Sequence, residues 1–400
     1  MTIRLRGNRD LIKALNRNLI LNIVRSQGPL SRTQLTELSG LSVGAVSQIT
    51  SDLLEEDWIV EVGEGESTGG RRQIMLRLNP DAAYAVGLKL MEDRLVCAVT
   101  DLEVTERYYL EQSFSGRTPE AIVLAIVNIV RRAIVEAGIS ARQLLGVGIG
   151  LAGVVDSQAG VVHYSPFFHW HELPLGEMVS SRLKIPVHVD NDVNTLTITE
   201  QMFGAGHGIE NFAVATIGRG IGMGLVLHHQ LYQGGPGGAG ELGHLVLEVN
   251  GPRCDCGNRG CLEALAADPA VLRYVREHTP AGRPSPQTLR EVIAAADGGD
   301  TVALDALARS GRYFGWGLSM LVNLFCPSLI VLSGEGVVAG DYRLRAMYEA
   351  LREHSFNGLL DNVAIIVKPT DDRAWARGAA GLVVGRFFES PLVKPEAAGV

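Results

Sequence analysis

The sequence predicts an α/β protein in which a small helical unit precedes two α/β lobes. At 400 residues the chain exceeds the ~250–300 residues at which single cores stop growing, so we expect several domains. Apolar residues near the N-terminus recur every three or four positions, as in amphipathic helices, whereas apolar runs alternate with helical patterns further on. We expect an N-terminal unit over 1–78, a first lobe over 82–193 with 381–400, and a second lobe over 194–380.

Three short helices are predicted in the N-terminal unit. The first has an apolar stripe along Leu11–Val24. Ser31 and Ser42 can cap the second and third helices, and Gly40-Leu41 forms the tight turn between them. This spacing is that of a helix-turn-helix, whose second helix enters the major groove of DNA. The third helix here turns outward Ser42, Val43, Ala45, Ser47, Gln48 and Ser51.

A basic hairpin is predicted to follow these helices. Trp58–Val62 and Gln73–Leu78 alternate as strands, and the segment between them carries Arg71 and Arg72. We therefore predict a winged helix-turn-helix that binds operator DNA through the outward face of the third helix and through these two arginines. The helices alone would also fit an ordinary bundle or a dimerisation cap.

The charge distribution favours DNA binding at one end of the chain. The net charge of -8 argues against a protein that coats nucleic acid along its whole length. Within the first fifty residues, however, only Asp10 and Glu37 oppose a set of basic residues: Arg4, Arg6, Arg9, Lys13, Arg17, Arg25 and Arg32. The start of the chain has no secretion signal and no apolar run could span a membrane, so we expect a cytoplasmic protein without membrane partners.

The remainder of the chain has the pattern of two α/β lobes. Helices are expected to dominate from Leu262 to Val322. The predicted first-lobe elements are strands at Tyr84–Leu90, Leu95–Thr100, Tyr108–Ser113 and Leu145–Gly150 with a helix at Pro119–Ala137, and second-lobe strands are expected at Asn211–Ile217 and Gly224–Leu227.

A histidine and three cysteines lie close together in the sequence of the second lobe. Three thiolates and one imidazole suffice for a closed tetrahedral zinc site, so His244, Cys254, Cys256 and Cys261 are predicted to hold structural Zn²⁺. The alternative is a loop with reduced cysteines. Cys97 and Cys326 stand apart in apolar surroundings, and we expect both to be buried.

Three motifs together resemble the ROK family of repressors, open reading frames and sugar kinases. They are Gly240-Glu241-Leu242-Gly243-His244, the segment Cys254–Glu263, and Asp190–Asn194. The N-terminal unit makes the chain similar to the repressor branch, which includes xylose and N-acetylglucosamine repressors. The resemblance implies a two-lobed actin-like ATPase (sugar kinase-like) fold with sugar between the lobes. It also implies zinc ligands at His244, Cys254, Cys256 and Cys261, and sugar-binding residues at Asn191, Asp192, Glu241, His244 and Glu263.

The family's phosphate-binding loop is altered in this chain. Where the kinases have Asp-x-Gly-Gly-Thr, Lys89 replaces the aspartate, Met91 and Glu92 replace the glycines, and Asp93 replaces the threonine. Carboxylates beside a triphosphate would repel it. We therefore predict no enzyme activity and no catalytic residue, with Asp192 as a vestigial base. The segments Thr216–Gly224 and Leu332–Val337 still resemble nucleotide loops, although the second has Glu335 in place of a glycine. The alternative is therefore an ATP-dependent sugar kinase with an accessory DNA-binding head.

The expected function is a sugar-responsive repressor of carbohydrate genes. A sugar or sugar phosphate would bind between the lobes and relieve repression, and a homodimer or homotetramer would read paired half-sites. Control by a protein partner is a further possibility. In the segment Pro166–Trp170, Phe167 replaces an amide that often binds sugar, so the aromatic side chains could stack on a pyranose or simply pack on the lobe.

Overall fold

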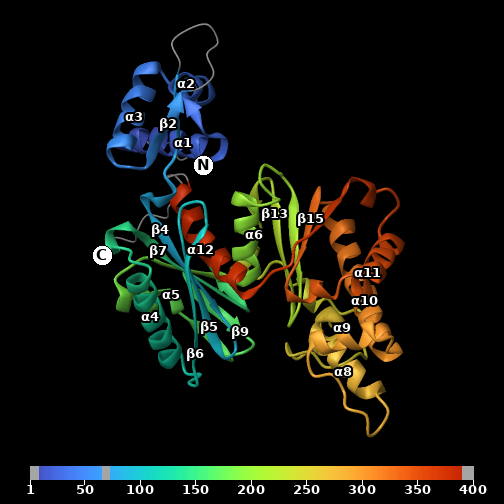
Figure 1. The fold of residues 1–400 in the computed structure, drawn as a ribbon. Coiled ribbons are helices and arrows are strands. Elements are labelled where there is room, and N and C mark those ends of the chain that lie inside the picture. The colour runs from blue at the N-terminus through green and yellow to red at the C-terminus, as the bar shows by residue number, and fades with distance from the viewer. Residues whose placement is uncertain (1–8, 65–72, 390–400) are drawn as a thin grey trace.

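The computed structural model describes residues 9–64 and 73–389 and places a small head above two α/β lobes (Figure 1). This arrangement confirms the predicted fold class of a winged helix-turn-helix followed by two lobes. No helix in the described ranges is long and apolar enough to cross a membrane.

The head contains three helices and a small antiparallel sheet. Its second helix begins with a capping box, because Ser31 accepts from the backbone of Gln34 while the Gln34 side chain accepts from the Ser31 N–H. Gly40, at φ 67°, ends that helix, and Ser42 caps the next one. The elements are α1 (Arg9–Gln27), α2 (Arg32–Ser39), α3 (Val43–Glu55), β1 (Leu30–Ser31), β2 (Ile59–Glu64) and β3 (Ile74–Leu78), in the sheet order β1-β3-β2.

The first lobe is built on a five-stranded sheet in the order β11-β7-β4-β5-β6. Its three strands β11, β7 and β4 are parallel, so their carboxyl ends meet at one edge. The elements are β4 (Tyr84–Leu90), β5 (Arg94–Thr100), β6 (Glu106–Ser113), α4 (Pro119–Glu136), β7 (Leu144–Leu151), β8 (Val154–Asp156), β9 (Val161–Ser165), β10 (Trp170–Leu173), α5 (Leu175–Leu183) and β11 (Val187–Asn191).

The second lobe repeats this plan with the order β14-β13-β12-β15-β16, in which β12, β15 and β16 are parallel. The elements are α6 (Asp192–Phe203), β12 (Phe212–Ile217), β13 (Ile221–Leu227), β14 (Gln230–Leu231), α7 (Leu262–Ala266), α8 (Asp268–His278), α9 (Leu289–Asp297), α10 (Thr301–Phe325), β15 (Leu329–Ser333), α11 (Asp341–His354) and β16 (Ala364–Val367). The last helix, α12 (Asp372–Phe388), returns to the sheet of the first lobe.

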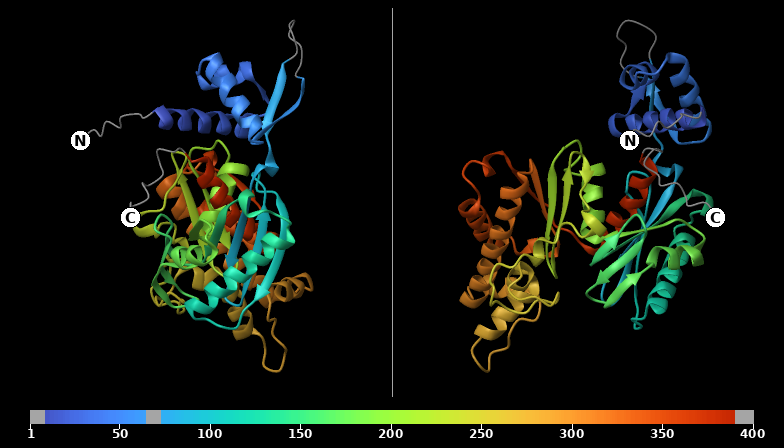
Figure 2. Two further views of the ribbon diagram at one scale, coloured as in Figure 1. Left: turned by 90° about the vertical axis from the view of Figure 1, so that its left-hand side faces the viewer. Right: turned by 180° about the vertical axis from the view of Figure 1, so that it is seen from behind.

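Helices α6 and α12 lie between the two sheets, and the last turn of α12 reaches the head (Figures 1 and 2). Close packing of α12 on the first sheet depends on small residues. A Cβ atom added at Gly148 of β7 would lie 1.9 Å from the Ala379 carbonyl oxygen, and one at Gly87 of β4 would lie 2.0 Å from the Ala376 carbonyl oxygen. The helix is therefore seated directly on these strands.

The core of the head continues into the body. Head residues such as Leu53 and Leu76 belong to the same buried cluster as Leu102, Val384 and Phe388. One predicted core residue is wrong: Cys97 is buried, but Cys326 is exposed, because it is the left-handed C-cap residue that ends α10. Arg71 and Arg72, the predicted wing contacts, lie outside the described residues.

Candidate functional site

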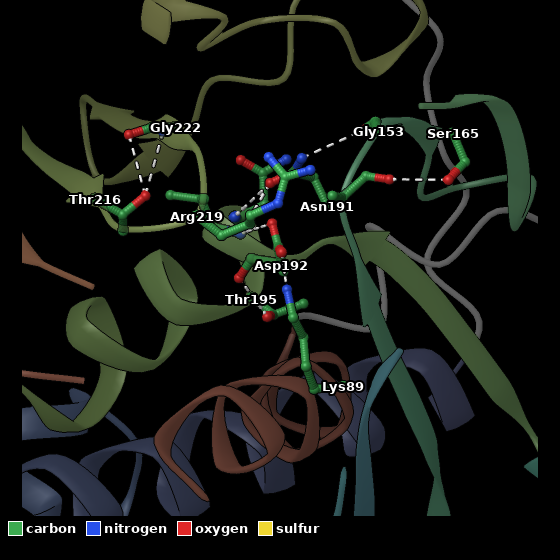
Figure 3. A network of polar contacts seen from close by, with 12 residues as sticks. Lys89, Gly153, Ser165, Asn191, Asp192, Thr195, Thr216, Arg219 and Gly222 are labelled. Atoms are coloured by element: carbon green, nitrogen blue, oxygen red, sulfur yellow. Dashed lines mark hydrogen bonds and ion pairs between the residues drawn. The ribbon is translucent and has the colours of Figure 1, made fainter. Parts of the chain in front are cut away.

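A buried ion pair joins the end of β4 to the start of α6. Lys89 lies near the carboxyl end of β4, and its ammonium group contacts Asp192, with both residues only 8% exposed (Figure 3). The ammonium also lies 4.7 Å from the centroid of the Trp375 ring on α12. Burial lowers the pKa of Lys89 to about 8, although Glu335 and Asp372 oppose that shift. Asp192, the predicted vestigial base, is thus paired with a cation.

The remaining polar atoms at this strand end are also engaged. Asn191 caps α6, since its side-chain oxygen accepts from Val193 N at 2.8 Å and its amide donates to the Gly153 carbonyl oxygen at 3.0 Å (Figure 3). Asp190 accepts from Asn194 and Gln233, and burial raises the pKa of Asp190 to about 6. The residue that is predicted to bind sugar, Asn191, therefore also forms the cap of α6.

The loop between β12 and β13, Gly218-Arg219-Gly220, is closed by two carboxylates. The Arg219 N–H donates to Glu335 at 2.7 Å, and the Ile221 N–H donates to Glu263 at 3.0 Å. Cβ atoms added at the two glycines would lie 2.2 Å and 2.7 Å from the carboxylate groups of these same glutamates. This is the loop that resembles the second phosphate loop, and the N–H groups of Arg219 and of the following Ile221 already donate to carboxylates of the chain itself.

The Arg219 side chain bridges the two lobes. Its Nε contacts Glu92, in the turn between β4 and β5, at 3.0 Å, and its Nη2 lies 3.4 Å from Asp255 in the cysteine loop. The guanidinium also lies 5.2 Å from the centroid of the Phe167 ring. Phe167 is therefore covered by an arginine, while Phe168 and Trp170 stack on each other in the core of the first lobe. For Phe168 and Trp170, this packing favours the alternative in which the aromatic side chains pack on the lobe over the one in which they stack on a pyranose.

The predicted metal ligands are brought together by the structure. The ligand atoms of His244, Cys254, Cys256 and Cys261 all lie within 4.8 Å of one another, so the group could hold a metal ion. The Cys256 and Cys261 sulfur atoms are 3.7 Å apart, as are the Cys254 sulfur and His244 Nδ1. Tetrahedral Zn–S bonds of about 2.3 Å place sulfur atoms about 3.8 Å apart, so the donor set and its spacing fit this ion.

Two of the predicted sugar-binding residues, Glu241 and Glu263, lie beside this cluster, and a third, His244, belongs to it. His244 Nε2 is 3.6 Å from Glu241, and Glu263 is 3.8 Å from the Cys254 sulfur. The first residues of β13 connect them to the other two, Asn191 and Asp192. Ile221 of that strand donates to Glu263, and a Cβ added at the next residue, Gly222, would lie 2.7 Å from a methyl group of Val193, which follows Asp192.

The predicted DNA-binding residues of α3 form one side of that helix. Ser42, Val43, Gln48 and Ser51 are exposed, and Ala45 and Ser47 are half-buried. The Gln48 amide donates to Asp52 at 2.7 Å, which holds its side chain along the helix surface. This face is free of the head core, which Val46, Ile49 and Leu53 form.

Comparison with known proteins identifies the family. The ROK family profile matches residues 85–386, and a winged helix-turn-helix DNA-binding profile matches residues 15–60. The chain belongs to the ROK family. It is 31% identical to the DNA-binding transcriptional dual regulator NagC of Escherichia coli, covering 97% of each chain. It is 28% identical to the xylose repressor of Bacillus subtilis, covering 96% of this chain and 98% of that one.

A solved ROK structure supports the same assignment. A ROK family transcriptional regulator described as a homologue of the E. coli MLC protein superposes with a TM-score of 0.84 at 26% identity, covering 96% of this chain and 98% of the other. All three of these proteins are named as repressors or transcriptional regulators, and they match the chain over nearly its whole length. The prediction of a regulator rather than an enzyme is confirmed.

Sequence reasoning missed several residues that complete the site. Arg219 could have been found from the sequence, because it is a charged residue between two glycines, Gly218 and Gly220. Trp375, by contrast, lies in a helix whose sequence gives no sign that it faces Lys89, because that contact depends on how α12 packs on the sheet.

Proposed function

We propose that the protein is a sugar-responsive transcriptional repressor of carbohydrate uptake or metabolism genes. The head binds operator DNA, and a sugar held by Asn191, Asp192, Glu241, His244 and Glu263 relieves repression. The observation that carries this proposal is that helix α12 contacts both the site and the head.

At its N-terminal end, α12 faces the buried ion pair. Trp375 is buried there against the Lys89 ammonium. A sugar hydroxyl that hydrogen-bonds to Asp192 shares this carboxylate with Lys89, because a carboxylate accepts several hydrogen bonds. The new hydrogen bond shifts Lys89 within the pair, and with it the contact on α12.

At its C-terminal end, α12 is part of the head interface. Phe387 stacks on Trp58 with ring centroids 4.8 Å apart, and the Phe388 carbonyl oxygen accepts from Asn22 of α1 at 3.0 Å. Arg25 of α1 lies over the Phe388 ring at 5.0 Å. A shift of α12 thus moves the surface on which the head rests, which changes the spacing of two heads in a dimer or tetramer.

We further propose that His244, Cys254, Cys256 and Cys261 hold a structural Zn²⁺ ion. The ion would fix the loop that carries Glu241 and the start of the helix that carries Glu263, because these residues touch its ligands. In this role zinc supplies positioning and no reaction step.

Operator binding across a sugar panel tests the proposal. Fluorescence anisotropy with the full chain and its operator should show that at least one sugar weakens binding ~10-fold or more, which corresponds to about 1.4 kcal/mol of coupling. The change should be absent in the Asp192→Asn variant if that carboxylate holds the sugar. Unchanged operator affinity with every sugar would contradict a sugar-responsive repressor and favour control by a protein partner.

A further inference from the structure

The loop that resembles a phosphate loop of the family's kinases is occupied in this chain by its own carboxylates. A phosphate-binding loop works by offering free backbone N–H groups to an anion. In the loop Gly218-Arg219-Gly220, the N–H of Arg219 is taken by Glu335 and that of the following Ile221 by Glu263. The glutamates also occupy the space above the two glycines. Both donors and space are therefore withheld from a phosphate.

The cations at the site are likewise engaged. Lys89 is held by Asp192 in a buried pair, and Arg219 is held by Glu92 and Asp255. Arg94, on the neighbouring strand β5, is taken by Asp372 at 2.6 Å. A phosphate that recruited Lys89 or Arg219 would leave carboxylates without their counter-charge, and the loss is largest for the buried Asp192.

The charge balance of the site points the same way. The site holds three cations, Lys89, Arg94 and Arg219, and six carboxylates, namely Glu92, Asp192, Asp255, Glu263, Glu335 and Asp372. A sugar phosphate would add a dianion to a site that already has an excess of negative charge. A neutral polyol instead finds acceptors for its hydroxyl groups at Asp192 and Glu263 without a charge penalty.

We propose that the effector of this protein is an uncharged, unphosphorylated sugar. The inference rests on the proposed sugar response and specifies the class of sugar. The carboxylates Glu92 and Glu335, which stand where the family's kinases have glycine, act as the residues that exclude the phosphorylated form.

Matched sugar pairs test this selectivity. Titration calorimetry of the full chain would compare glucose with glucose 6-phosphate and N-acetylglucosamine with its 6-phosphate, and operator binding would be followed in parallel. In any pair that binds, we expect the neutral member to bind at least ~10-fold more tightly and to be the member that releases operator. Equal or tighter binding of the phosphorylated member would overturn the inference while leaving the sugar response intact.

A charge-neutralising variant separates electrostatics from shape. The double substitution Glu92→Gln and Glu335→Gln should tighten binding of the phosphorylated member at least ~5-fold and leave the neutral sugar nearly unchanged, because the amides keep the size of the side chains. Glu277→Gln, at an exposed position of α8, is the matched control. No gain for the phosphorylated member would overturn the role of these glutamates. Failure of every sugar, neutral or phosphorylated, to bind would instead overturn the proposed function itself.

Discussion

At the scale of single residues, a cation has replaced a carboxylate at the centre of a kinase-like site. Lys89 is predicted to stand where the kinases carry the aspartate of their phosphate loop, and it pairs with Asp192, which is predicted to match the kinase base. A carboxylate held by a buried ammonium is a poor base. It can still accept a hydrogen bond from a hydroxyl group, so recognition can persist where catalysis does not.

Removing one partner of this pair should cost more than removing both. Lys89→Met leaves the Asp192 carboxylate buried without its cation, and we expect a loss of about 3 kcal/mol in the free energy of unfolding. Lys89→Met combined with Asp192→Asn should recover most of this loss, because neither charge remains. Urea unfolding of the two single variants and the double variant measures the coupling. Additive losses would show that the two side chains do not depend on each other.

At the scale of elements, α12 connects the site to the head. Its small residues let it sit against β4 and β7, and its aromatic residues at the C-terminal end pack on the head. The helix thus has one face fixed by the sheet and two ends that contact different functional parts of the molecule.

Helix α12 lies so close to β7 that a methyl group added at Gly148 should destabilise the protein. In Gly148→Ala the added Cβ would lie 1.9 Å from the Ala379 carbonyl oxygen, so the helix backbone has to move. We expect a loss of about 3 kcal/mol in stability, at the upper end for overpacked cores. Gly235→Ala is the control, because no atom lies within 4 Å of its added Cβ. Equal stability of the two variants would mean that α12 is not seated as described.

The contact between α12 and the head should be needed for the response to sugar. Phe387→Ala removes the stacking on Trp58, and we expect sugar binding to persist while the effect of sugar on operator affinity falls at least ~5-fold. Calorimetry reports the first quantity and anisotropy the second. Phe356→Ala, at an exposed position after α11, should leave both unchanged. A full sugar effect in Phe387→Ala would exclude this route.

Local elements of the fold could be predicted from the sequence, and the contacts between distant segments could not. Ser31, Gly40 and Ser42 mark the helix ends of the head through capping chemistry within a few residues, and the structure has them as predicted. The spacing of the histidine and the three cysteines in the sequence likewise predicted the cluster of possible metal ligands. Lys89 and Asp192 are 103 positions apart, so their pairing depends on the strand order, which the apolar pattern does not specify. Cys326 was misjudged because exposure at a helix end depends on tertiary packing.

At the scale of the whole molecule, the site combines groups from both lobes. Arg219 and the cysteine loop come from the second lobe, whereas Glu92 and Phe167 come from the first. A ligand that binds among these groups therefore acts on the relation between the lobes, and α12 lies at that junction (Figure 1).

Loss of the proposed zinc ion should impair the proposed sugar response before it impairs DNA binding. Cys256→Ser removes a ligand, and we expect loss of bound zinc and a fall in sugar affinity of about 10- to 100-fold. Operator affinity should change less than ~3-fold, because the head lies outside the metal loop. Metal analysis, calorimetry and anisotropy measure these quantities, with Cys326→Ser as the control. Parallel loss of sugar and operator binding would indicate global unfolding instead.

Binding of a sugar at the site between the lobes should change the affinity of the head for DNA. The most direct measurement is the operator affinity of the full-length wild-type protein, with and without a neutral sugar whose binding calorimetry has established. Saturating sugar is expected to weaken operator binding ~10-fold or more. Identical operator affinity in the sugar-bound and sugar-free protein would contradict this expectation.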